Sequence, residues 1–260
     1  MTEFVESIGT TGRPRDSAVP RPRPWGVVMS IAWVALAFEF FLDRACDYVF
    51  ALPAVKAFVD DSRAWHSVEL LVAWAVTLLV IIVAVLLKRW PVAAYLNWFK
   101  PRGRDLAFGI AVIVIWCLLS RTVLRYFMTG DAFGVADYRA AVAAGTSPSW
   151  YVLQWWPIYI CSPFVEETAL RGFMWRGIEY RAGRVAALVV TSLYFAGMHY
   201  GYYIKGTEID PFGFVDYLIT AFLLGWLRWR SGTSTVSIVA HCIDNMWVYL
   251  PAVIASAFVA

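Results

Sequence analysis

Long apolar runs fill most of this 260-residue chain and constrain its fold more than any other feature. They lie at about residues 25–42, 67–87, 106–128, 151–175, 185–204, 212–227 and 234–259. Each run approaches the ~20 residues that a helix needs to cross the ~30 Å hydrocarbon layer of a bilayer. Only 16% of the residues are charged, against about 25% in ordinary soluble domains. The sequence therefore predicts an all-α protein, a polytopic membrane helical bundle of about seven transmembrane helices.

Basic residues are distributed unevenly over the segments that connect these runs. The N-terminal tail and the segments 88–105, 171–184 and 228–233 together carry 15 Lys and Arg residues, whereas the alternate segments carry seven. Because cytoplasmic loops of membrane proteins are enriched in Lys and Arg, this pattern predicts a cytoplasmic N-terminus and an outside C-terminus. The net charge of +3 fits contact with anionic lipid headgroups, and nothing in the sequence indicates a nucleic-acid partner.

Composition divides the chain into three parts. Residues 1–24 contain four Arg and four Pro, which predicts a disordered cytoplasmic tail. A cleaved secretory signal is disfavoured because the positive region is long and no clear cleavage site follows the first apolar run. Residues 25–149 hold about three transmembrane helices and an outside loop, in which 137–144 could form a short surface helix or a lid. Residues 150–260 form the remaining membrane core.

Three short polar patterns lie in order on the last apolar runs. They are Glu-Glu-x-x-x-Arg at 166–171, Phe-x-x-x-His at 195–199 and His-x-x-x-Asn at 241–245. Ionisable residues are costly inside a membrane, so they mark functional sites by default. Two of the three histidines of the chain fall in these patterns. The concentration predicts a polar catalytic cavity inside the membrane.

Helix geometry separates the roles of the two adjacent glutamates. Glu167 lies four residues before Arg171, the spacing and order that favour an ion pair, whereas Glu166 points about 100° away. Glu166 is then free to face the cavity as a general base. If the chain turns at Ala182-Gly183, Glu166 and His199 are equally far from the turn and reach the same depth. The sequence therefore predicts that Glu166 and His199 lie close together.

The third pattern supplies hydrogen-bond donors. His241 and Asn245 are one helical turn apart and could together hold a developing oxyanion. Asp244 is close enough in angle to orient the His241 ring, and Phe195 is expected to pack against His199. For the three patterns to meet, the segment 171–184 must project into the cytoplasm by about 10 to 15 Å. The predicted site therefore lies inside the membrane, nearer the cytoplasmic face.

Taken together, EETALR, FAGMH and HCIDN resemble the three motifs of the CPBP (Abi, CAAX-protease-like) family of intramembrane endopeptidases. The resemblance covers about 150–251 and implies a helical bundle around a polar cavity. It also implies that Glu166 and His199 activate water, that His241 and Asn245 stabilise the oxyanion, and that Glu167 and Arg171 are structural. A metal-free mechanism is favoured. Zinc held by Glu166, His199 and His241 is the alternative.

The predicted function is hydrolysis of a peptide bond of a membrane-associated protein or peptide near the cytoplasmic interface. Two other classes compete with it. One is a non-catalytic membrane scaffold or immunity-type binding protein that uses the same cavity, and the other is an ion-coupled transporter, for which no inverted repeat is visible. Richness in Arg and Ala suggests a bacterial plasma (inner) membrane. The sequence does not identify the substrate.

Overall fold

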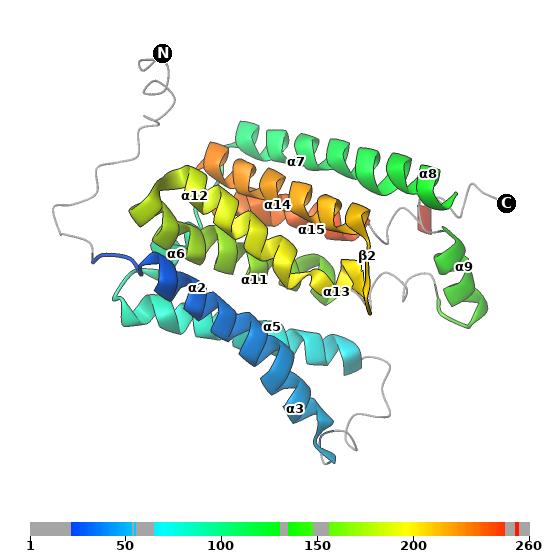
Figure 1. Cartoon of the computed structure of the whole chain (residues 1–260), viewed down its shortest axis with the longest axis horizontal. Coiled ribbons are helices and arrows are strands. Elements are labelled where there is room, and N and C mark those ends of the chain that lie inside the picture. Colours follow the sequence, from blue (N-terminus) through cyan, green and yellow to red (C-terminus); the bar gives the residue numbers. More distant parts are fainter. Residues whose placement is uncertain are drawn as a thin grey trace.

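The computed structural model describes residues 22–53, 55, 65–130, 135–147, 156–247 and 253–254. Within these residues the chain is mostly helical and forms a bundle, which confirms the predicted all-α class (Figure 1). The expected disordered tail, 1–24, lies almost entirely outside the described residues, as does most of the last apolar run beyond residue 247.

The first apolar runs form one side of the bundle (Figure 1, blue and cyan). The first helix begins as α2 (Val27–Ala35), continues with π-helical hydrogen bonding as η1 (Leu36–Ala45), and ends as α3 (Cys46–Ala51). It packs against α5 (Trp65–Leu87). The short helix α6 (Val92–Leu96) follows and contacts the part of the chain that carries the first motif.

The third apolar run lies on the opposite side of the bundle (Figure 1, green). It consists of α7 (Gly103–Cys117), the π-helical segment η2 (Leu118–Leu124) and α8 (Arg125–Thr129). α7 packs mainly against the last helix of the core. In the segment that follows, α9 (Val135–Ala143) is helical, where the sequence allowed either a short surface helix or a lid at 137–144.

The motif-bearing elements lie between these two sides. In order they are η3 (Pro157–Cys161), α11 (Ser162–Glu167), η4 (Thr168–Met174), α12 (Trp175–Met198), α13 (Tyr200–Tyr203), β1 (Ile204–Lys205), β2 (Glu208–Ile209), α14 (Pro211–Ser231) and α15 (Ser234–Trp247). The antiparallel β1–β2 hairpin was not predicted. Gly183, with φ 84° and ψ 174°, breaks α12 into two helices. Because glycine tolerates positive φ, the chain reverses at the predicted turn.

Two helical segments of the described residues, Glu69–Leu87 and Gly103–Met128, are long and apolar enough to cross a membrane. The predicted number of seven spans is therefore not confirmed, although each expected run does contain helix. The part of α12 beyond Gly183 has only about 15 residues, or ~22 Å of helix, and α15 is described only as far as Trp247. Both also carry polar residues that lower their hydropathy.

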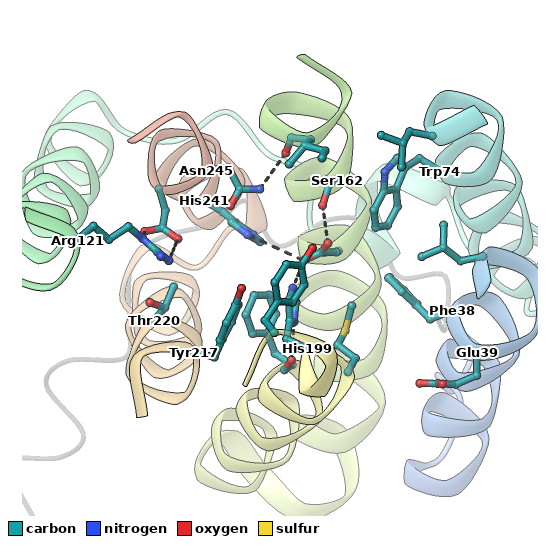
Figure 2. Close-up of a pocket in the computed structure, with 18 residues that line it drawn as sticks. Phe38, Glu39, Trp74, Arg121, Ser162, His199, Tyr217, Thr220, His241 and Asn245 are labelled. Carbon is teal, nitrogen blue, oxygen red and sulfur yellow. Dashed lines mark hydrogen bonds and ion pairs between the residues drawn. The ribbon is translucent and has the colours of Figure 1, made fainter. Parts of the chain in front are cut away.

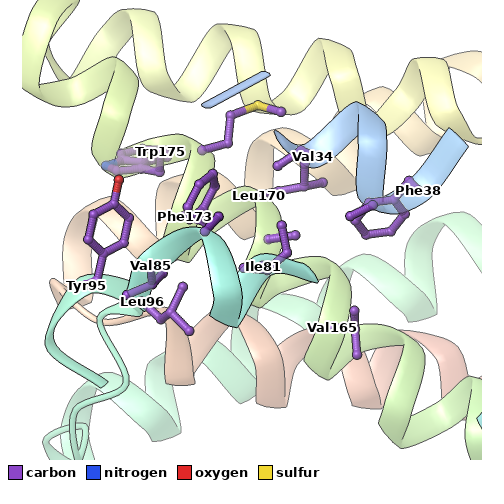
Figure 3. Close-up of a cluster of buried hydrophobic side chains, with 14 of the residues drawn as sticks. Val34, Phe38, Ile81, Val85, Tyr95, Leu96, Val165, Leu170, Phe173 and Trp175 are labelled. Carbon is purple, nitrogen blue, oxygen red and sulfur yellow. The ribbon is translucent and has the colours of Figure 1, made fainter. Parts of the chain in front are cut away.

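A large apolar cluster joins the N-terminal helices to the motif-bearing core (Figure 3). Val34, Ile81 and Leu170 come from three different segments and are fully buried in it. The backbones approach closely where glycine is present. A Cβ atom on Gly172 would lie 2.7 Å from the carbonyl oxygen of Leu96. This cluster fixes the position of α11 and η4, which carry the first motif.

Candidate active site

A cavity of about 440 Å³ lies between the N-terminal helices and the motif-bearing helices. Figure 2 shows Phe38 and Trp74 on one side, Arg121 on the opposite side, and His199 and His241 between them. The lining residues fall into an apolar wall and a polar wall. They are Phe38, Glu39, Leu42, Leu70, Trp74, Arg121, Ile158, Ser162, Glu166, Phe195, Met198, His199, Tyr202, Tyr217, Thr220, His241, Asp244 and Asn245.

Glu166 lies at the centre of the polar wall and is only 3% exposed. Its Oε1 atom accepts a 2.5 Å hydrogen bond from the Ser162 hydroxyl, one helical turn earlier. Its Oε2 atom lies 3.9 Å from Nε2 of His199 and 4.0 Å from Nε2 of His241. The structure thus brings the predicted base together with both motif histidines, without a direct hydrogen bond to either.

Glu167 has a different environment, although it is the next residue along α11. Its Oε1 atom accepts from the Arg171 guanidinium at 3.0 Å and contacts Nδ1 of His241 at 3.2 Å. Glu167 and Arg171 are both fully buried, and Arg171 also donates to the carbonyl of Ala221. The predicted Glu167–Arg171 pair is therefore present, and Glu167 also orients the His241 ring.

His199 follows the last residue of α12 and is held on three sides. Its Nδ1 atom lies 2.8 Å from the carbonyl oxygen of Phe195. Because a carbonyl can only accept, Nδ1 carries the proton and Nε2 faces Glu166. The imidazole also lies between two rings, Phe195 at 4.4 Å and Tyr217 at 4.8 Å between centroids. The expected packing of Phe195 against His199 is thus present, together with a hydrogen bond that was not foreseen.

Asn245 and Asp244 have partners that the sequence did not indicate. Asn245 lines the cavity, and its Nδ2 atom donates to the carbonyl of Ile158 at 2.9 Å, which leaves a second N–H on that amide. Asp244 was expected to orient His241. Instead, its two oxygens accept from Nε and Nη2 of Arg121 at 3.0 and 2.9 Å. The bidentate contact with Arg121 holds the Asp244 carboxylate against η2. The His241 ring is oriented by Glu167 instead.

Sequence patterns did not indicate several polar residues of the cavity wall, among them Ser162, Arg121 and Tyr217. For Arg121 a signal existed, because an arginine inside an apolar run is itself a functional candidate. Ser162 lies one turn before Glu166, but that spacing has meaning only once the helix is known. Nothing in the sequence pointed to Tyr217.

All four π-helical segments of the described residues border this site. η1 carries Phe38, η2 carries Arg121 and η3 carries Ile158, all of which line the cavity, and η4 carries Arg171, which lies behind it against Glu167. Single π-helical turns inside α-helices are rare and occur frequently at functional sites. Here each segment places one of these side chains at or directly behind the cavity wall.

The height of the site in the bundle was predicted from residue counts, with the segment 171–184 projecting about 10 to 15 Å into the cytoplasm. This projection stays a prediction. Near the turn at Gly183, α12 and α14 pack closely, because a Cβ atom on Gly225 would lie 2.6 Å from the Leu188 side chain.

Tyr217, which stacks on His199, lies six residues after the start of α14 and 14 before its end. Measured along α14, the site is therefore nearer the end with the β1–β2 hairpin than the end at Ser231. In the orientation predicted from the basic residues, the hairpin end is the outside end. With a cytoplasmic N-terminus, Tyr217 therefore lies nearer the outside end of α14.

Glu166, His199 and His241, the alternative zinc ligands, do not fit a zinc ion in their present positions. Ligands of tetrahedral zinc at about 2.0 to 2.1 Å are separated by about 3.3 Å. Oε2 of Glu166 is 3.9 and 4.0 Å from the two Nε2 atoms. Among the described residues, no three His, Cys, Asp or Glu side chains are grouped for a metal ion.

The fold and this cavity define a helical membrane protein with an acid–base site of one carboxylate and two imidazoles. Residues 148–247 match the family described as type II CAAX prenyl endopeptidase Rce1-like. Over this segment the chain is therefore similar to the CAAX-protease-like family of membrane proteases, which confirms the resemblance seen in the three motifs. Comparisons with curated proteins and with solved structures found no match.

Proposed function

We propose that this protein is an intramembrane endopeptidase that hydrolyses a peptide bond of a membrane-associated protein or peptide. The observation that carries the proposal is the position of the Glu166 Oε2 atom, 3.9 Å from Nε2 of His199 and 4.0 Å from Nε2 of His241. The protease family of residues 148–247 supports it. A buried carboxylate with one oxygen facing two imidazoles is suited to take a proton from water.

In the proposed reaction, Glu166 and His199 activate the attacking water. The water donates one hydrogen to Glu166 Oε2 and the other to Nε2 of His199, which has a lone pair because Nδ1 carries the proton. Its oxygen bonds to the scissile carbonyl carbon while Glu166 takes the proton. When the C–N bond breaks, Glu166 returns that proton to the leaving nitrogen. The products are a carboxyl group and an amine.

His241 and Asn245 would stabilise the oxyanion of the tetrahedral intermediate. Since Glu167 accepts from Nδ1 of His241, the ring can donate from Nε2 only as an imidazolium. The carboxylates of Glu166 and Glu167, both within 4.0 Å of the ring, favour that charged form. The second N–H of the Asn245 amide would provide the other donor. No step of this mechanism requires a metal ion.

The cavity also suggests the kind of substrate. Phe38, Leu42, Leu70 and Trp74 form an apolar wall opposite the reacting groups. An extended peptide with large apolar side chains near the cleaved bond, as in a membrane-associated segment, would bury them against this wall. We propose a bacterial plasma membrane as the location, with about seven spans and a cytoplasmic N-terminus.

The side of the membrane on which cleavage occurs depends on that orientation. It is tested by replacing the native cysteines, placing a single cysteine at Glu208 or at Arg181, and labelling intact cells with a membrane-impermeant maleimide. In the proposed orientation only Glu208→Cys is labelled, and cleavage then occurs nearer the outer face. Labelling of Arg181→Cys alone would place the cut nearer the cytoplasmic interface, as the motifs first suggested.

The central test is Glu166→Gln. Mass spectrometry of protein termini in membranes of the producing cells is compared for wild type, Glu166→Gln, and Glu208→Gln, an exposed control on the hairpin. New termini are expected with wild type and with Glu208→Gln, and their loss is expected with Glu166→Gln at equal protein levels. Persistent cleavage in Glu166→Gln would overturn the mechanism. Identical termini in cells with and without the protein would favour a non-catalytic scaffold.

A further inference from the structure

The two adjacent glutamates of α11 have different hydrogen-bond partners. Glu167 is bound by two groups that carry or can carry positive charge, Arg171 and His241. Glu166 accepts a hydrogen bond from a neutral hydroxyl, that of Ser162, through Oε1. Its Oε2 atom has no hydrogen-bond partner among the described residues. The carboxyl groups of Glu166 and Glu167 therefore have different environments, although they are chemically the same.

The hydroxyl of Ser162 suits a carboxylate that changes its protonation state. An arginine is a donor only and would hold a carboxylate in the ionised form. A serine hydroxyl can donate to the carboxylate and can also accept from the carboxylic acid. The contact of Ser162 with Glu166 can therefore persist when Glu166 gains and loses a proton.

The contact also fixes the direction of the carboxylate. Ser162 and Glu166 are one turn apart on a buried helix, with exposed fractions of 6% and 3%. With Oε1 held by Ser162, Oε2 is the oxygen that faces His199 and His241 at 3.9 and 4.0 Å. Without that hydroxyl, rotation of the carboxylate would be free to move Oε2 away from the imidazoles.

We propose that Ser162 is a positioning residue that holds Oε1 of Glu166, so that Oε2 faces His199 and His241 as the proton-accepting atom. The proposal rests on the endopeptidase function proposed above. It assigns a role to a residue outside the three motifs. It also predicts that the turnover rate depends on the hydroxyl of residue 162 and not on the volume of its side chain.

The expected effects follow from the loss of one hydrogen bond to a charged group, which corresponds to about 10- to 100-fold in rate. For Ser162→Ala, kcat falls by about this factor while KM stays within about twofold, because substrate binding is not the step affected. Ser162→Thr, which keeps a hydroxyl, restores most of kcat. Ser30→Ala removes a buried hydroxyl in α2 and is the matched control, expected to leave kcat unchanged.

The kinetic probe is a quenched fluorescent peptide made from the cut found by the analysis of protein termini. The second measurement needs no cleavage: infrared difference spectra of purified protein, each variant minus its own Glu166→Gln form, isolate the vibrational bands of the Glu166 carboxyl group. In Ser162→Ala these bands shift relative to wild type, because Oε1 has lost its hydrogen-bond donor. Ser162→Thr and Ser30→Ala follow wild type.

The kinetic and infrared measurements together show which proposal fails, the endopeptidase function or the role of Ser162. If wild type cleaves and Glu166→Gln does not, but Ser162→Ala matches wild type in kcat and in the infrared bands of Glu166, the role of Ser162 is wrong and the endopeptidase function stands. If wild type cleaves nothing, the endopeptidase function fails, and the infrared bands still decide whether Ser162 holds Glu166. Equal losses of kcat in Ser162→Ala and Ser162→Thr would also overturn the role of the hydroxyl.

Discussion

The two halves of the molecule contribute different kinds of residues to one cavity. The segment within the family match brings the carboxylates and imidazoles, Glu166, Glu167, His199 and His241. The half before residue 148 brings mostly apolar side chains, with Arg121 as the main exception. The chemistry is thus concentrated in about two fifths of the chain, but the cavity has no apolar wall without the rest.

Through Arg121, the N-terminal half also forms ion pairs with the segment that carries the motifs. It lies in η2, outside the matched segment, and pairs with Asp244 at 2.9 Å and with Asp216 at 3.3 Å. Asp244 lies on α15 between His241 and Asn245. The Arg121–Asp244 ion pair therefore connects η2 to α15, the helix that carries the third motif. The comparison of the two halves leads to four predictions, given from the largest expected effect to the smallest.

Arg121→Met is expected to destabilise the whole bundle. It leaves the buried Asp244 and the partly buried Asp216 without their shared cation, and breaking such a pair typically costs about 3 to 5 kcal/mol. Unfolding in detergent by denaturant measures the loss. Arg102→Met, at an exposed arginine before α7, is the control. The double variant Arg121→Met/Asp244→Asn should recover part of the stability. If Arg121→Met loses under about 1 kcal/mol, the halves are not linked through this pair.

Asn245→Ala tests the chemistry of the matched segment alone. Removal of an oxyanion donor elsewhere lowers kcat by about 10²- to 10³-fold, and a similar loss is expected here with KM little changed. The lost hydrogen bond to Ile158 should cost only about 1 kcal/mol of stability. Met246→Leu, one residue further on the same helix, serves as the control. An unchanged kcat in Asn245→Ala, measured with the cleavage-site peptide, would remove this residue from the oxyanion site.

Gly172→Ala tests the contact between the halves. The added Cβ atom would lie 2.7 Å from the backbone oxygen of Leu96, which cannot move as a side chain does. We expect a loss of about 1 to 3 kcal/mol in the free energy of unfolding. Gly197→Ala, where a Cβ atom meets nothing within 4 Å, should be neutral or slightly stabilising. Equal stabilities of the two variants would show that η4 and α6 pack less closely than described.

Trp74→Phe should have the smallest effect, and one confined to substrate binding. Trp74 lines the apolar wall and packs edge-on against Phe38 at 6.1 Å between ring centroids. The smaller ring should raise KM by about 3- to 10-fold for a peptide with a large apolar side chain, with kcat nearly constant. Leu79→Ala, on the exposed face of α5, is the control. A loss of kcat without a change in KM would place Trp74 among the residues that support the chemistry.

Local geometry explains which predictions succeeded. The helical runs follow from apolar length, and the turn at Gly183 follows from an Ala-Gly pair between two such runs. The Glu167–Arg171 pair is fixed by the four-residue repeat of the helix, and so is the separation of Glu166 from it. The approach of Glu166 to His199 required only two helices of equal length joined at that turn.

By itself, then, the sequence determined the all-α class, the membrane character and the family resemblance of residues 148–247, because apolar periodicity and residue spacing are local properties. Only the tertiary structure decided that Glu167 orients His241 and that Asp244 pairs with Arg121. These contacts join residues 74 and 123 positions apart. No local pattern specifies such distant partners, since they depend on how helices from both halves pack around one cavity.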